Sequence, residues 1–375
     1  MRIALCGCGK MGRAVALDCL GQADLVELRL ADADPERLTR LSAELEDSRV
    51  NPRELNAADT AAVRDFATGC AVLVSAVSYR FNPALARAAV DAGCHFIDMG
   101  GNNDAVAREL ALDDDARRAG VTLVPDMGLA PGLVNVLTRS AFERLGGLDE
   151  ARLYVGGLPR DPRGEWRYEA VFSATGLINE YREPCLVLRE NEPRSVESLS
   201  EVERLEHPVL GELEAFHTSG GSSTLPATYA GRVRTLEYKT LRYPGHARLV
   251  RALFELGLDD EEPVELGGCR VRPRDLLEER IARRLAPVGE DLVVLTARFR
   301  GPDGALRVEL LDYADAVGGL SAMMRCTGFP VAVTAQLLAR GEISVPGAQT
   351  PEHLPPRPIL AGLAERGLEL SFHED

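Results

Sequence analysis

The stretch that decides the fold is IALCGCGKMG, at residues 3–12. A short apolar run enters a glycine-rich turn and the helical pattern of residues 13–20 follows, which predicts a strand, a turn and a helix. In such a turn Gly7 makes the tight bend, Gly9 lets the backbone approach a pyrophosphate, and Gly12 lets the helix pack on the strand. Free N–H groups at the helix N-terminus bind the anion. The stretch therefore indicates a dinucleotide-binding unit.

An acidic residue strengthens this interpretation and bears on the cofactor. A second apolar run at residues 26–31 ends in Asp32, twenty residues after Gly12. A carboxylate at this spacing can accept both ribose hydroxyls of the adenosine, and it repels a 2′-phosphate. Because the first arginine after it is Arg37, we predict NAD as the cofactor. Arg37 leaves NADP as the alternative.

The alternation of strand and helix continues to about residue 130. Apolar runs at 71–77, 95–101 and 121–126 are separated by helical patterns, including one at 105–119, and this is typical of a doubly wound parallel sheet. Ligands of such sheets bind beyond the carboxyl ends of the strands. Besides the three glycines and Asp32, the predicted cofactor contacts are Lys10, Met11, Ser75, Ala76, Val77, Met99 and Gly100.

The character of the sequence changes after residue 130. Residues 131–318 carry strand-like runs with few helices between them, at 152–156, 168–172, 185–188, 213–216, 232–241, 292–300 and 305–313. They predict a second α+β domain on a mostly antiparallel sheet. Residues 319–341 look helical with an interruption at 327–330, and we expect the segment 319–375 to return to the nucleotide domain, residues 1–130. The fold class is α/β.

Composition excludes several function classes. The chain has 375 residues, 45% of them apolar, and a net charge of −15, which argues against a nucleic acid or an anionic membrane as partner. No leader and no apolar run of ~18 residues is evident, so we expect a cytoplasmic protein. The eight cysteines form no CxxC pair and no cluster with histidine, which predicts no metal site.

Candidate catalytic residues follow the predicted strands. Asp126 stands after the run at 121–126, where its carboxylate could hold an ammonium, accept its proton or activate water; capping of the helix near Pro131 is the alternative. His217 opens a loop rich in glycine and serine and could act as an acid or base; an ordinary loop histidine without a catalytic role is the alternative. The second domain also offers candidate substrate-binding residues, although a solvated strand face, a helix cap or core packing would explain them too: Glu180, Lys239, Arg242 and Tyr243. Of these, Arg242 suits a carboxylate.

Several motifs together resemble the saccharopine dehydrogenase-like family, and within it the NAD-dependent lysine 6-dehydrogenases. They are the glycine turn, DMGLAPG at 126–132, GGLP at 156–159, GLINEY at 176–181, FHTSGG at 216–221, residues 239–246, MRCTGFP at 324–330 and GEI at 341–343. The resemblance implies oxidative deamination of the ε-amino group of L-lysine to 2-aminoadipate 6-semialdehyde, which cyclises to a piperideine carboxylate. It also implies a homodimer or larger assembly.

Other functions stay open at this point. Saccharopine dehydrogenase chemistry would need cations for two more carboxylates, and Arg182, Arg232 and Arg234 could supply them. Another amino acid or diamine could be the substrate, and a carboxynorspermidine-type reductase would use NADPH, which Asp32 disfavours. A non-catalytic NAD-binding sensor is the alternative from another class, although Asp126, His217 and Arg242 argue against it.

Overall fold

The computed structural model describes residues 1–374 and divides into two compact units. Unit 1 comprises Met1–Arg144, Ser223–Leu225 and Met324–Glu369, and unit 2 comprises Leu145–Ser222, Pro226–Met323 and the C-terminal residues from Leu370. The expected domain boundary at 130/131 precedes α7 (Leu133–Arg144), which packs on η2 and α13 within unit 1. The segment from Met324 to Glu369 also lies in unit 1.

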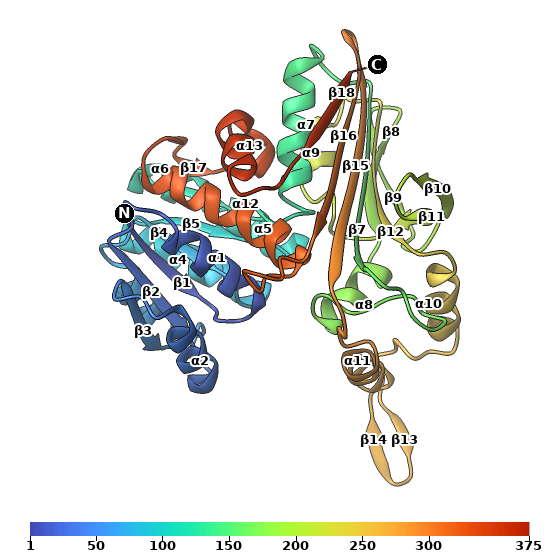
Figure 1. Ribbon diagram of the computed structural model, residues 1–375, viewed down its shortest axis with the longest axis horizontal. Helices are drawn as coiled ribbons and strands as arrows, with labels where there is room; N and C mark the ends of the chain where they lie inside the picture. Colours follow the sequence, from blue (N-terminus) through green and yellow to red (C-terminus); the bar gives the residue numbers. More distant parts are fainter. Residues whose placement is uncertain (375) are drawn as a thin grey trace. The chain divides into compact units, whose positions relative to one another are not determined.

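Unit 1 is built on a seven-stranded parallel sheet (Figure 1). The strand order is β17-β6-β5-β4-β1-β2-β3, so the order reverses at β1, which lies between β2 and β4. The elements besides α7 are β1 (Arg2–Cys6), α1 (Lys10–Leu20), β2 (Glu27–Asp32), α2 (Pro35–Leu45), β3 (Val50–Glu54), α3 (Thr60–Ala67), β4 (Val72–Ser75), η1 (Tyr79–Phe81), α4 (Asn82–Ala92), β5 (His95–Asp98), α5 (Asn103–Leu110), α6 (Asp113–Ala119), β6 (Thr122–Val124), α12 (Ala322–Ala339, from Met324 on), β17 (Gly347–Ala348), η2 (Pro351–His353) and α13 (Pro356–Ala364).

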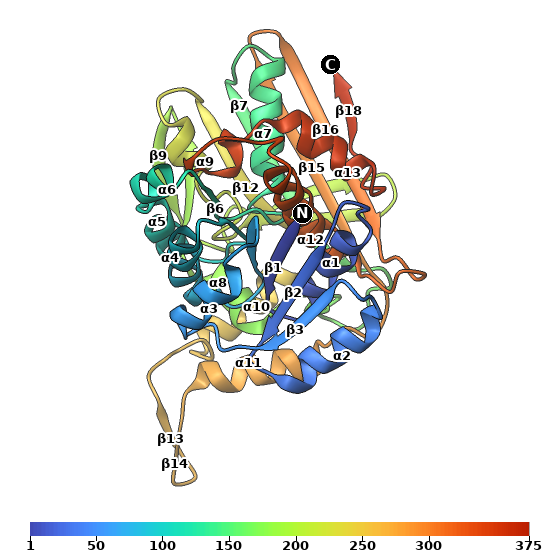
Figure 2. The same cartoon turned by 90° about the vertical axis from the view of Figure 1, so that its left-hand side faces the viewer.

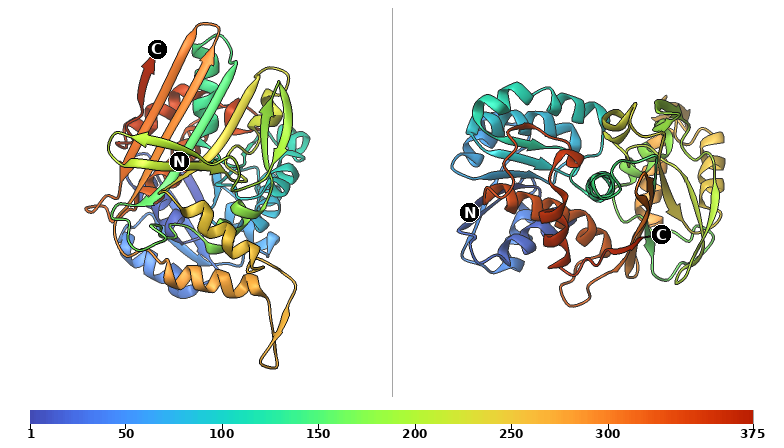
Figure 3. Two further views of the ribbon diagram at one scale, coloured as in Figure 1. Left: turned by 90° about the vertical axis from the view of Figure 1, so that its right-hand side faces the viewer. Right: turned by 90° about the horizontal axis from the view of Figure 1, so that it is seen from above.

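Unit 2 is built on a nine-stranded mixed sheet, in which β12 and β7 are parallel and the other pairs are antiparallel. The order is β10-β11-β12-β7-β15-β16-β18, and β8 pairs with β12 and with β9. The long strands β15 and β16 lie side by side, in orange in Figure 3. Its elements are β7 (Glu150–Pro159), α8 (Ala174–Arg182), β8 (Cys185–Arg189), β9 (Glu192–Val196), β10 (Glu203–His207), β11 (Gly211–His217), α9 (Leu225–Tyr229, from Pro226 on), β12 (Thr235–Arg242), α10 (His246–Glu255), β13 (Val264–Leu266), β14 (Cys269–Val271), α11 (Pro273–Arg284), β15 (Asp291–Gly301), β16 (Gly304–Tyr313) and β18 (Ser371–Glu374).

The predicted fold class is confirmed, three local predictions were wrong, and an edge strand was missed. The edge strand β3 beside β2 (Figure 2) was missed because four of its five residues are exposed and give no apolar pattern. Residues 168–172 form no strand; their apolar side chains pack into the cluster around α8 and α10. The helix predicted at 105–119 is two helices, α5 and α6. The predicted interruption at 327–330 is absent, since α12 continues through the buried Pro330.

In residues 1–374, no helix combines the length and the apolar character that crossing a bilayer requires.

Candidate active site

The glycine turn of unit 1 has two glycines that the fold requires and one that it does not. Gly7 has φ 105°, and a Cβ there would lie 2.5 Å from the carbonyl oxygen of Ala76. A Cβ on Gly12 would lie 1.8 Å from the carbonyl oxygen of Gly7. A Cβ on Gly9 would have no atom within 4 Å, so protein packing does not explain this glycine. The open space at Gly9, before the first residue of α1, fits the close approach of a dinucleotide pyrophosphate.

Asp32, the acid at the end of β2, is hydrogen-bonded to the backbone of the glycine turn. Asp32 is buried, and its carboxylate accepts hydrogen bonds from the backbone N–H of Cys8 at 2.8 Å and of Asp34 at 2.9 Å. Arg37 lies beside it, with a guanidinium nitrogen 3.7 Å from Asp32 Oδ2. A carboxylate at the position predicted to bind the ribose and a cation that could meet a 2′-phosphate therefore occur together.

The other predicted cofactor residues lie at the carboxyl edge of the same sheet. Ser75, the last residue of β4, is buried, and its hydroxyl donates to Asn82 Oδ1 at 2.7 Å. This hydrogen bond connects the end of β4 with the start of α4. Ala76 and Val77 are partly exposed at this edge, and the first turn of α1 contributes the exposed Lys10 and the partly exposed Met11. Met99 and Gly100, also partly exposed, follow β5.

Asp126 is the most unusual residue of unit 1. It has φ 63°, its side chain is buried, and its carboxylate accepts a hydrogen bond from the Ser223 hydroxyl. Burial first, and then the negative charge of Asp98, raise the pKa of Asp126 from its ordinary 3.8 to about 8. The hydrogen bonds from Ser223 and from the Gly101 backbone offset part of this rise. A carboxyl of this kind can accept and release a proton near neutral pH.

Two buried acids next to Asp126 were missed by the sequence analysis. Asp98 ends β5 and Glu109 lies on α5, and each is 1% exposed. Asp98 accepts a hydrogen bond from the backbone N–H of Asp126 at 3.0 Å, and its own carbonyl accepts one from Met127 at 2.9 Å. The one available signal was an acid at the carboxyl end of a predicted strand, which Asp98 shares with Asp32.

A second group of polar side chains is buried in unit 2 around Arg242. Its Nε donates to the Tyr181 hydroxyl at 3.1 Å, and its guanidinium carbon lies 4.8 Å from the ring centroid of Tyr168. Tyr181 in turn contacts His246 Nε2 at 3.0 Å. Burial and the charge of Arg242 lower the pKa of His246 to about 3, so this imidazole is neutral. Among residues 1–374 Arg242, which is 2% exposed, forms no ion pair.

Glu180 belongs electrostatically to the same group. This half-buried carboxyl on α8 has its pKa raised by burial to about 7, and the positive charge of Arg242 limits the rise. A guanidinium and a carboxyl that influence each other without pairing offer one group for a carboxylate and one for an ammonium.

His217 and Lys239 lie on the other face of this sheet. They are directly opposed on β11 and β12, whereas Arg242, three residues after Lys239, points to the opposite face. His217 is fully buried, and its ring contacts the Tyr238 carbonyl at 3.2 Å and Glu201 Oε2 at 3.3 Å. Lys239 pairs with Glu203 at 3.1 Å. Both side chains are therefore engaged within unit 2.

Tyr243, the remaining candidate, is buried and donates its hydroxyl to the Pro159 carbonyl at 3.2 Å. It packs with Tyr154 and Leu241 in the core on the His217 face. Its role in the structure is the packing of unit 2.

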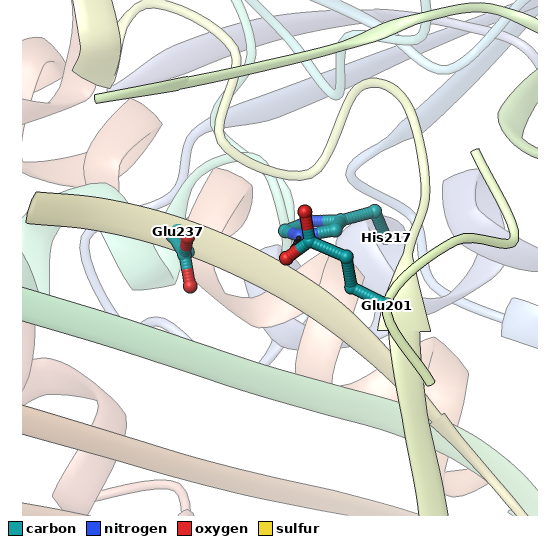
Figure 4. A group of neighbouring side chains, drawn as sticks. All are labelled: Glu201, His217 and Glu237. Atoms are coloured by element: carbon teal, nitrogen blue, oxygen red, sulfur yellow. Dashed lines mark hydrogen bonds and ion pairs between the residues drawn. The ribbon is translucent and has the colours of Figure 1, made fainter. Parts of the chain in front are cut away.

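Glu201, His217 and Glu237 form a group that resembles a metal site (Figure 4). One ligand atom from each lies within 4.8 Å of the others. Arg189, however, donates to Glu201 at 2.6 Å and to Glu237 at 3.0 and 3.1 Å. The two carboxylates thus already have a cation, so the donor set as arranged does not fit a metal ion.

Comparison with known protein families decides the relationship. The model of the saccharopine dehydrogenase NADP binding domain matches residues 3–124, and that of the saccharopine dehydrogenase C-terminal domain matches residues 128–368. The chain belongs to the saccharopine dehydrogenase family. Unit 1 therefore carries the pyridine-nucleotide-binding domain of this family, with the glycine turn inside the matched region.

Individual relatives of this saccharopine dehydrogenase family member are distant. The chain is 22% identical over 425 residues to the mitochondrial alpha-aminoadipic semialdehyde synthase of Rattus norvegicus, covering 93% of this chain and 45% of that protein. It is 23% identical over 354 residues to the saccharopine dehydrogenase (NADP(+), L-glutamate-forming) of Saccharomyces cerevisiae, covering 75% of this chain and 78% of that protein. The chain thus spans less than half the length of the first of these relatives.

Two solved structures share the fold over the whole chain. The apo saccharopine dehydrogenase (L-Glu forming) from Saccharomyces cerevisiae has a TM-score of 0.81 at 20% identity, with 100% of this chain and 99% of that chain covered. The homospermidine synthase of Legionella pneumophila in complex with NAD has a TM-score of 0.71 at 13% identity, with 100% and 91% covered. At these identities the likeness shows the fold of the family.

Proposed function

We propose that this family member is an NAD-dependent dehydrogenase that oxidises the bond between the ε-carbon and the ε-nitrogen of L-lysine. The observation that carries the proposal is Asp126, a buried carboxyl at the carboxyl edge of the dinucleotide-binding sheet whose pKa is raised to about 8. Amine oxidation needs a base of this kind, because an ammonium of pKa ~10.4 must lose a proton before its carbon can lose hydride.

The residues of unit 1 fit a nicotinamide dinucleotide. The open space at Gly9 would take the pyrophosphate, and Asp32 would hold the adenosine ribose. When bound, the oxidised nicotinamide supplies a hydride acceptor for the substrate carbon. We propose NAD because Asp32 repels a 2′-phosphate, while the exposed Arg37 is the feature that would favour NADP.

Asp126 would act as the proton acceptor for the amine. In its ionised form it takes one proton from the substrate ammonium, and the neutral amine then yields an iminium as its carbon is oxidised. Water adds to the iminium and ammonia leaves, which gives 2-aminoadipate 6-semialdehyde. The Ser223 hydroxyl, hydrogen-bonded to the Asp126 carboxylate, holds the orientation of the base.

Within unit 2, Arg242 offers a cation for a carboxylate and Glu180 a carboxyl for an ammonium, and we propose these two as the amino acid contacts of that unit. The Arg242 guanidinium is buried without an ion pair among residues 1–374, a situation that an incoming carboxylate relieves. Tyr181 orients the guanidinium by accepting a hydrogen bond from Nε. Glu180, under the influence of the same guanidinium, would accept the α-ammonium.

Saccharopine is the second candidate substrate, because the yeast relative is named a saccharopine dehydrogenase. In saccharopine the same nitrogen carries a glutarate arm, so two more carboxylates need partners. Arg182, one possible partner, already donates to Asp259 Oδ2 at 3.1 Å, and Arg234 is a half-exposed side chain 4.0 Å from Glu190. The engagement of Arg182 favours a substrate with one carboxylate.

The experiment is a set of NADH-formation assays with the purified protein. L-lysine, saccharopine, ornithine and diamines are each offered with NAD and with NADP. Reduction of NAD in the presence of L-lysine supports the proposal. Reduction only with saccharopine would make saccharopine the substrate instead. NAD binding without reduction by any amine would favour a sensor and contradict both.

A further inference from the structure

The carboxyl group of Asp98 organises the loop that carries Asp126. Its Oδ1 accepts hydrogen bonds from the backbone N–H of Gly100 at 2.6 Å and from that of Asp126 at 3.0 Å. Both donors stabilise the ionised form of Asp98. One carboxylate thus connects the loop after β5 with the loop after β6.

A second buried acid lies near Asp98. Burial and the negative charge of Asp98 raise the pKa of Glu109, and the two side chains are each 1% exposed. Within residues 1–374, Asp98 Oδ2 and both oxygens of Glu109 have no N–H or O–H donor from any other residue. Two ionised carboxylates in this position would repel each other and leave three buried oxygens without a donor, and one proton held between them would remove both costs.

We propose that Asp98 and Glu109 form a buried carboxylate–carboxylic acid pair that shares one proton, and that the single charge of this pair positions Asp126 and makes it the stronger proton acceptor. Glu109 donates, because Asp98 already accepts two backbone hydrogen bonds and Glu109 accepts none. Asp98 and Glu109 are therefore positioning residues, which act on the substrate through Asp126.

The charges around these acids agree with this assignment. Burial raises the pKa of both acids, but at Asp98 the two backbone hydrogen bonds that it accepts oppose this rise. At Glu109 the charges of Asp98 and Asp126 raise the pKa further, and the charge of Arg108, its neighbour on α5, opposes the rise. Asp126 faces Asp98 from β5 and Glu352 from η2, and both negative charges raise its pKa. None of the described residues places a cation in an ion pair with Asp98, Glu109 or Asp126.

The proton itself can be observed without turnover, which separates this inference from the proposed function on which it rests. Infrared spectra of the apo protein at neutral pH are compared between Asp126→Asn and the double variant Asp126→Asn/Glu109→Gln. The Asn background removes any signal from Asp126. We expect Glu109→Gln to remove one carbonyl band of a protonated carboxylic acid. Unchanged bands would mean that both acids are ionised, and this would overturn the proposal.

The influence on Asp126 is tested by the pH dependence of amine oxidation. Asp98→Asn keeps an oxygen that can accept the two N–H groups but removes the charge, so the midpoint of the rise in turnover should fall by about one pH unit. Glu109→Gln keeps a neutral donor, so it should move the midpoint less than Asp98→Asn does. The matched control is Asp104→Asn, the same change at an exposed position of α5.

If the pH midpoint of turnover is the same in Asp98→Asn as in Asp104→Asn, the proposed influence of the Asp98 charge on Asp126 is overturned. If Asp98→Asn does not fold, the Glu109→Gln variant provides the test. A midpoint of its pH–turnover curve about one unit below that of the unmodified protein would also overturn this influence, because it would show that Glu109 carries the charge. Should no amine be oxidised, the proposed function fails and the infrared bands alone decide on the shared proton.

Discussion

The backbone N–H of Asp126 donates a hydrogen bond to the carboxylate of Asp98 over 3.0 Å. This bond brings two buried acids together where the described part of the chain offers no cation to pair with them. Asp126 also has φ 63°, a conformation that side chains other than glycine seldom adopt. Burial, like charge and backbone strain each cost free energy, and such costs concentrate at functional sites. Their coincidence at Asp126 is the strongest argument for a chemical role.

We expect Asp126→Asn to reduce turnover by about 10²–10⁴-fold, because an amide cannot accept the proton of the amine. Asparagine tolerates positive φ well, so the fold should be retained. NAD binding, followed by fluorescence titration, should persist. Turnover close to that of the unmodified protein would remove Asp126 from the chemistry.

The pH dependence of stability gives a second test. The pKa of Asp126 is about 8 in the folded protein and lies near 3.8 when unfolded, so between these values only the folded state holds the proton. The free energy of unfolding should therefore fall as pH rises through this range, by on the order of a few kcal/mol, and level off above pH 8. Asp126→Asn lacks this loss, so in urea titrations its advantage over the unmodified protein should grow with pH. A constant difference would contradict the raised pKa.

The sequence predicted the parallel sheet well because buried parallel strands read as continuous apolar runs, as at 71–77 and 121–126. The prediction failed where the local residue pattern does not reflect how deeply a segment is buried. The edge strand β3 contains Pro52 and mostly exposed residues, and Pro330 is accommodated inside the buried helix α12. In both places the surrounding structure overrides the local signal.

The site was predicted in part for a similar reason. Asp126 follows a strand of the parallel sheet, and this position alone directs it to the ligand-binding edge. Glu109 gave no such signal, because an acid in a helix is normally a solvated one. The candidates at 239–246 were close in sequence, yet alternation along β12 sends Lys239 and Arg242 to opposite faces. Only the fold separates them.

Cofactor preference depends on Asp32 and Arg37. Asp32→Ala should weaken NAD binding by about 10-fold or more through the lost ribose hydrogen bonds, and narrow any preference over NADP. Asp32→Ala also removes the acceptor for the backbone N–H groups of Cys8 and Asp34. Asp32→Asn, which keeps one side-chain oxygen, is therefore the milder comparison. Arg37→Ala should weaken NADP without affecting NAD. An unchanged NAD to NADP ratio of dissociation constants in Asp32→Ala would contradict the ribose assignment.

Two glycines of the turn should respond differently to alanine. Gly12→Ala places a Cβ 1.8 Å from the Gly7 carbonyl oxygen, so it should destabilise the protein by about 1–3 kcal/mol. Gly9→Ala meets no atom within 4 Å and should leave the thermal unfolding temperature nearly unchanged. It should instead weaken NAD, because the new methyl group occupies the space of the pyrophosphate. Full NAD affinity in Gly9→Ala would argue that the dinucleotide does not approach this backbone.

Arg242 tests the recognition of the α-carboxylate. The Arg242→Lys substitution keeps the positive charge but removes the planar guanidinium, which can bind both carboxylate oxygens at once. The KM for the substrate L-lysine should therefore rise by about 10–100-fold. The value of kcat should change less, since the reacting carbon is at the other end of the substrate. Arg248→Lys is the matched control, because Arg248 is an exposed residue of α10. A diamine without a carboxylate should show no such rise in KM. If both substrates lost affinity equally, Arg242 would be maintaining the cluster with Tyr181 and not reading the carboxylate.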